Sequence, residues 1–105
     1  MDHAAQIKEY APSADPAVVA ALLKRYRLVL SKSDSATVAF GDAKELERVR
    51  KNFLRKSLGL TKSDEELDAA IAEVGQRLKS TRNKSRAVVY YLLAEKFGRL
   101  DFFAS

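Results

Sequence analysis

Residues 87–97, AVVYYLLAEKF, decide the fold. In a helical projection their apolar side chains occupy nearly the whole circumference, and Glu95 and Lys96 are the only charged members. A helix that is apolar all round must be buried in protein or in lipid. This run is far shorter than the ~20 residues that a helix needs to cross a bilayer. We therefore predict a helix at the centre of a protein core, wrapped by the other helices.

Three amphipathic helices are predicted upstream, and each begins at a residue that can cap free backbone N–H groups. The caps are Asp15, followed by Pro16 at the first helical position, then Asp42, and Ser63 in an S-x-x-E capping box. Gly59 stands where a left-handed residue would end the second helix. With the central helix, the predicted helices cover about residues 16–31, 43–58, 64–79 and 84–97.

These elements predict an all-α fold, a compact four-helix array or bundle with the apolar C-terminal helix at its centre. Residues 2–10 are compatible with an extra short N-terminal helix, anchored by Ile7 and Tyr10. Residues 31–42, SKSDSATVAFGD, lack a helical period and are predicted to be a connecting loop. A length of 105 residues suits one helical domain over 1–105.

The composition excludes several classes of protein. At 47% hydrophobic and 31% charged residues, the chain is too apolar to be disordered. It has no cysteine, which excludes disulfides, zinc–thiolate sites and thiol catalysis. The start, MDHAAQIKEY, lacks the apolar core of a signal peptide, and no run is long enough for a membrane span. We expect a cytoplasmic protein that does not bind membranes.

Three segments carry a family resemblance: RVRKNFLRKSLGL, SDEELDAAI and KSRAVVYYLLAEKFG, in this order and over nearly the full length. The chain resembles a family of small bacterial helical proteins known only as a domain of unknown function. The resemblance implies a compact helical bacterial protein. It implies no activity, ligand or catalytic residue.

No catalytic constellation is visible in the sequence. The sole histidine, His3, lies next to the amino terminus, where ordering is poor. The acidic residues at 64–68 are best explained as capping and compensation of the helix dipole, because they lack the spacing of a calcium loop. Phosphate-loop, dinucleotide-binding and nucleophile-elbow motifs are missing. We therefore expect a protein that is not an enzyme and that has no metal site and no cofactor.

A first basic feature lies on the second predicted helix. In an α-helix, steps of four, three and four residues would place four cations in one stripe, which a phosphate backbone could follow. A solvated helix face, paired within itself or with the acidic turn at 64–68, explains the same pattern. The members of this stripe are Lys44, Arg48, Lys51 and Arg55.

A second basic feature precedes the central helix, in the segment 79–86. Free N–H groups, hydroxyls and cations at a helix start would suit a phosphate or another anion. A plain hydroxyl cap with solvated cations is the competing explanation. The predicted anion-binding residues are Ser80, Thr81, Arg82, Lys84, Ser85 and Arg86.

Three functions stay open at this point. The leading one is a non-enzymatic binding or interaction module with a basic surface and an anionic partner, nucleic acid being the first candidate; the net charge of +5 favours it. The second is a protein-interaction or self-associating domain, in which the acidic turn at 64–68 meets the basic stripe at 44–55 of another copy, or a basic stripe of a partner protein. An acidic protein surface is also a candidate partner of this chain. The third is a binder of a small phosphate ligand at 79–86.

Overall fold

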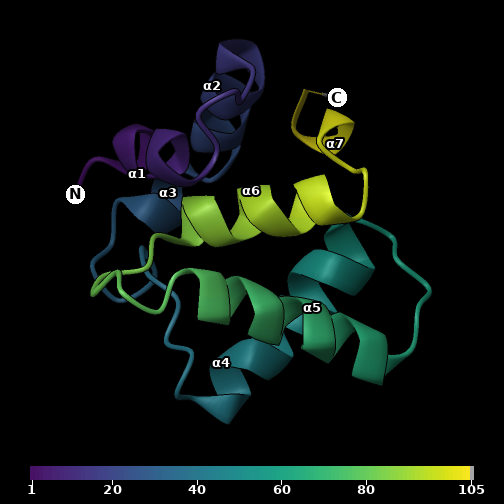
Figure 1. The fold of residues 1–105 in the computed structure, drawn as a ribbon. Helices are drawn as coiled ribbons and strands as arrows, with labels where there is room; N and C mark the ends of the chain where they lie inside the picture. Colours follow the sequence, from purple (N-terminus) through teal and green to yellow (C-terminus); the bar gives the residue numbers. More distant parts are fainter. Residues whose placement is uncertain (105) are drawn as a thin grey trace.

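The computed structural model describes residues 1–104, and this part of the chain is built from helices with one isolated β-bridge and no strand. The all-α class is therefore confirmed (Figure 1). The arrangement as a four-helix bundle is not confirmed, because further helices join the four predicted ones. The elements are α1 (His3–Tyr10), α2 (Pro16–Arg25), α3 (Arg27–Leu30), α4 (Ala43–Arg48), the π-helix η1 (Val49–Ser57), α5 (Asp64–Arg77), α6 (Arg86–Lys96) and α7 (Asp101–Ala104).

Helix α6, which contains the run quoted above, is the centre of the fold. Every residue from Arg86 to Ala94 is buried. Figure 1 shows α6 crossing the middle of the molecule, with α1 and α2 on one side and α5 on the other, and all three helices contact it. The prediction of a buried central helix is thus confirmed, although α7 follows it in the chain. Within residues 1–104, no helix is long and apolar enough to cross a membrane.

The predicted helix boundaries are set by local capping, and the structure confirms the caps. Asp15 accepts from Ala17 N at 2.8 Å and Ser63 accepts from Glu66 N at 3.2 Å. Asp42 accepts from Lys44 N at 3.0 Å in the same way. Gly59 ends its helix with a φ of 69°, in the left-handed region that favours glycine.

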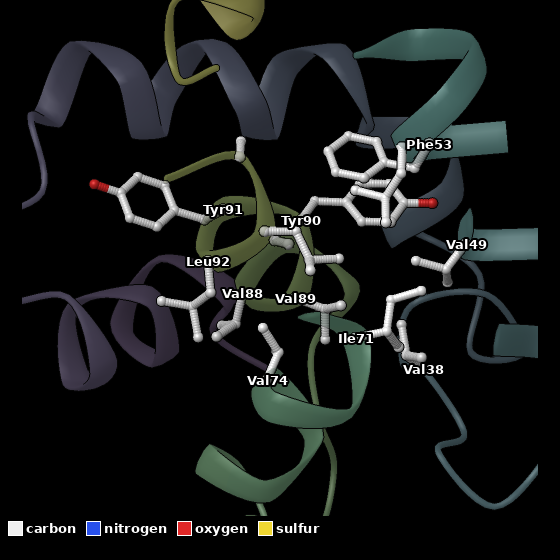
Figure 2. Close-up of a cluster of buried hydrophobic side chains, with 14 of the residues drawn as sticks. Val38, Val49, Phe53, Ile71, Val74, Val88, Val89, Tyr90, Tyr91 and Leu92 are labelled. Atoms are coloured by element: carbon white, nitrogen blue, oxygen red, sulfur yellow. The ribbon is translucent and has the colours of Figure 1, made fainter. Parts of the chain in front are cut away.

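The predicted helix over 16–31 is interrupted at Tyr26, where α2 ends and α3 begins. The ring of Tyr26 packs edge-on against Tyr90 of α6, with 5.0 Å between ring centroids, and against Phe53. Phe53 in turn stacks on Tyr90 at 3.8 Å. These rings join the end of α2 to η1 and α6, and Figure 2 shows two of them, Phe53 and Tyr90, in the core with Val49, Ile71 and Val89.

The predicted helix over 43–58 changes type at Val49, from α to π. The N–H of Leu58 donates to Phe53 O at 2.9 Å, five residues back. In an α-helix, the nine steps from Val49 to Leu58 make about two and a half turns, which would put these two residues on opposite faces. In a π-helix, residues five apart lie one turn apart, so Val49, Phe53, Leu54 and Leu58 all reach the core.

The 31–42 loop is fastened to the helices at several points. Thr37 forms an antiparallel bridge with Ser85, and Val38 N donates to Lys84 O at 3.0 Å. Val38 is buried, and Phe40 packs on Gly75 of α5, where a Cβ would lie 2.6 Å from the Phe40 ring. The loop therefore runs beside the start of α6 and brings its polar side chains to that end of the helix.

Candidate functional site

Ser85 and its neighbours at the start of α6 are held by the N-terminal helix. Ser85 is completely buried and caps α6, accepting from Ala87 N at 3.1 Å. His3 Nδ1 lies 2.6 Å from the Ser85 hydroxyl, and Gln6 Oε1 accepts from Ser85 N at 2.8 Å. His3 thus belongs to an ordered helix and has a structural partner. The buried hydroxyl has no open path to a substrate.

Arg86 is also buried, and its guanidinium binds the loop. Its Nε donates to Ser35 O at 2.6 Å and its Nη2 donates to Thr37 O at 3.2 Å. Its Nη1 donates to the Tyr90 hydroxyl at 3.2 Å, and Nη2 forms an ion pair with Glu45. Burial lowers the pKa of Arg86, but the Tyr90 and Glu45 side chains outweigh it, so the pKa lies above its ordinary value.

The other residues of the predicted 79–86 site point to different partners. Lys84 Nζ donates to Thr81 O at 2.7 Å, and the Thr81 hydroxyl bonds to that of Tyr10. Ser80 and Arg82 are exposed, with no hydrogen bond or ion pair from their side chains in the described part of the chain. The six residues do not converge on one point, because Ser85 and Arg86 face the interior. Anion binding at 79–86 stays a prediction.

The four cations of the predicted stripe are likewise directed to different neighbours. Arg48 pairs with Glu45 at 3.0 Å and Lys51 with Glu47 at 3.4 Å. Arg55 pairs with Asp64 of α5, and Lys44 is exposed without an ion pair among residues 1–104. The change to a π-helix contributes to the divergence, since a spacing of three residues, as between Arg48 and Lys51, aligns side chains in an α-helix but not in a π-helix. Binding by these residues also stays a prediction.

The acidic first turn of α5 is occupied within its own chain. Asp68 pairs with Arg50 at 2.7 Å, and Asp64 lies between Arg50 and Arg55. Arg50 and Arg55 are five residues apart and share Asp64, as expected for side chains one turn apart on a π-helix. The hydrogen bond from Arg55 holds the pKa of Asp64 below its usual value. No cluster of metal-ligating side chains occurs among the described residues.

Glu45 brings together one residue from each predicted site. It is only 8% exposed, and its two carboxylate oxygens bind Arg48 and Arg86. An Arg–Glu–Arg triad carries one surplus positive charge. Beside this triad lies a cavity of about 340 Å³ between the 31–42 loop, α4, η1 and α6. We call it the loop pocket; its polar lining is Asp34, Ser35, Glu45, Arg48, Asn52, Arg86 and Tyr90.

A second concavity, of about 410 Å³, lies at the C-terminal end of α2. We call it the α2 basic pocket; Lys24, Arg25 and Arg27 line it with Ala21 and Phe103, and no carboxylate does. Arg25 lies 4.1 Å above the ring of Phe102, and Arg27 Nη1 donates to Lys24 O at 3.3 Å. Sequence reasoning did not select these residues. The signal was present as the run KRYR at 24–27, whose cations lie off the apolar face.

Residues 2–101 match a family described as protein of unknown function (DUF2853), so the chain belongs to that family. The predicted resemblance to a family of unknown function is confirmed, while bacterial origin stays a prediction. The comparison with curated proteins gives no match.

Proposed function

We propose that this family member is a non-enzymatic binding module for an anionic partner, with nucleic acid as the first candidate. The observation that carries the proposal is the α2 basic pocket, a concavity lined by three cations and no carboxylate. Three like charges held near each other at one end of a helix create a positive potential that attracts phosphate groups. Each phosphate that a cation neutralises also releases counterions, which favours binding at low salt.

Further exposed cations support this proposal. The side chains of these cations form no ion pair within residues 1–104. Asp64 and Asp68, by contrast, form ion pairs with Arg55 and Arg50 of the same chain. The surplus positive charge is therefore free to act on a partner. These cations are Lys44, Lys56, Lys62, Lys79 and Arg82.

The test is fluorescence anisotropy with labelled single- and double-stranded DNA and RNA at two salt concentrations. We expect saturable binding that weakens as salt rises. The double variant Lys24→Gln/Arg27→Gln should weaken binding and lower the salt slope by about two, one unit for each lost phosphate contact. A matched control is Lys8→Gln/Lys96→Gln, which removes the same charge at two residues outside the α2 basic pocket and outside the set of unpaired cations above. Flat curves for all probes, or equal losses in both double variants, would contradict the proposal.

Self-association stays the alternative prediction. It requires the acidic turn at 64–68 to meet the basic residues at 44–55 of a second copy, although Asp64 and Asp68 already contact Arg50 and Arg55 of their own chain. A dimer of this kind would have to exchange those ion pairs between copies, so its formation should depend on salt. Light scattering over a range of concentrations distinguishes it from a monomer.

A further inference from the structure

The loop pocket contains polar groups that the fold itself does not use. The Asp34 carboxylate and the Asn52 carboxamide form no hydrogen bond or ion pair within residues 1–104. Arg48 uses Nε and Nη2 for Glu45 and leaves Nη1 unbound there. The Tyr90 hydroxyl accepts from Arg86, and its own hydrogen remains available to a further acceptor. The pocket thus offers both donors and an acceptor to a ligand.

The donors of the loop pocket belong to a rigid frame. Tyr90 and Arg86 are buried on α6, and Glu45 fixes the guanidiniums of Arg48 and Arg86. Asn52 is in η1, and π-helical segments are frequent at functional sites. Tyr90 and the two arginines, held by these contacts, lose little conformational freedom when a ligand binds, which favours affinity; Asn52 is exposed and has no such contact.

The charges lining the loop pocket determine the ligand class. The carboxylates of Asp34 and Glu45 balance the guanidiniums of Arg48 and Arg86, so the lining has no net charge. Arg48 and Arg86 share the single Glu45 carboxylate, so the triad keeps one surplus positive charge, with Arg48 Nη1 unbound, and Asp34 is the unpaired negative group. A multiply charged phosphate would meet the uncompensated Asp34 carboxylate. A zwitterion satisfies both charges.

We propose that the loop pocket binds a small zwitterion of the α-amino acid class. The ligand carboxylate accepts from Arg48 Nη1, the Asn52 amide and the Tyr90 hydroxyl, and the ligand ammonium group donates to Asp34. A volume of about 340 Å³ admits a molecule of this size. The inference is independent of the proposed function, because the loop pocket and the α2 basic pocket share no residue.

The test is a titration of the ¹⁵N-labelled protein with each of the proteinogenic L-α-amino acids, followed by NMR at the side-chain signals of Asn52 and Arg48. Each amino acid is compared with its N-acetylated form, which lacks the ammonium charge, and its α-amide, which lacks the carboxylate. We expect at least one free amino acid to shift these signals in a saturable way, with both blocked forms binding far more weakly. Unmoved signals for every free amino acid, or equal binding of the blocked forms, would overturn the proposal.

Variants of Asp34 and Asn52 separate binding from folding, because neither side chain supports the fold. Asp34→Asn should weaken the binding of the free amino acid about tenfold, which is the effect of losing one charge-assisted hydrogen bond. The free amino acid should then bind with less advantage over its N-acetylated form. Asn52→Ala should weaken the binding of the free and the N-acetylated amino acid by the same factor. The neighbouring exposed Lys51→Gln is the matched control and should leave binding unchanged. An effect of Lys51→Gln as large as that of Asp34→Asn would also overturn the assignment.

Discussion

Single residues at the start of α6 determine how the loop and the helices are joined. Glu45 lies between the guanidiniums of Arg48 and Arg86, and Arg86 in turn binds the carbonyls of Ser35 and Thr37. Removing one partner from a buried ion pair leaves an uncompensated charge, which costs more than the pair itself contributes. Stability should therefore depend strongly on Glu45.

Replacing Glu45 by glutamine keeps its shape and removes its charge. We expect Glu45→Gln to lower the free energy of unfolding by about 2–3 kcal/mol, since Arg86 keeps its other acceptors. Urea unfolding measures the loss. The control is Glu47→Gln, whose exposed pair with Lys51 should be worth less than about 1 kcal/mol. Equal losses in the two variants would contradict the role of the triad.

The pKa of the Asp64 carboxyl reports on the contact between η1 and α5. Its pKa lies below the ordinary value, chiefly because of the hydrogen bond from Arg55. The folded state thus binds this proton less readily than the unfolded state, so the contact stabilises the protein at neutral pH and is lost as the pH falls through the lowered pKa. Arg55→Gln should return the pKa toward its ordinary value in an NMR titration, whereas Lys51→Gln, a more distant charge, should change it less.

At the scale of the element, the type of helix decides which side chains of η1 are buried. Leu54 is completely buried, although an α-helix that buries Val49 and Phe53 would turn Leu54 toward the edge of that face. Leu54→Ala should therefore cost about 2–5 kcal/mol in urea unfolding, the range for a filled core position. Lys56→Ala, exposed on the same element, should change stability by less than about 0.5 kcal/mol. A loss below about 1 kcal/mol for Leu54→Ala would indicate an α-helical register.

The same element shows what sequence could and could not predict. Caps at Asp15, Asp42 and Ser63 were predictable because capping depends on a few adjacent residues. The spacing from Val49 to Leu58 fits a π-helix, but a pattern search for α-helical periods does not detect it. The cation stripe at 44–55 is derived for an α-helix in the same way, and binding by it stays a prediction. Arg86 could not be recognised as buried, because its partner Glu45 lies 41 residues away in the chain.

At the scale of the whole molecule, α1 closes the core and fixes the start of α6. The Gln6 side chain accepts from Ser85 N at 2.8 Å and donates to Asn83 O at 3.0 Å. It thus supplies hydrogen-bond partners to two backbone groups at the start of α6. Arg77 of α5 also reaches the carbonyl of Tyr10. The short N-terminal segment, which the sequence marked only by its anchors Ile7 and Tyr10, therefore connects α5 and α6.

This role predicts that the N-terminal helix contributes to global stability rather than fraying independently. Ile7 is 1% exposed and lies in the main core cluster, so Ile7→Ala should lower the free energy of unfolding by about 2–4 kcal/mol. Its exposed neighbour gives the control, since Lys8→Ala should change stability by less than about 0.5 kcal/mol. Hydrogen exchange adds a second readout: if α1 unfolds with the rest of the molecule, Ile7→Ala should speed exchange at the buried amides of α6 as well as in α1. Faster exchange confined to residues 3–10 would show instead that α1 opens by itself and leaves the core closed.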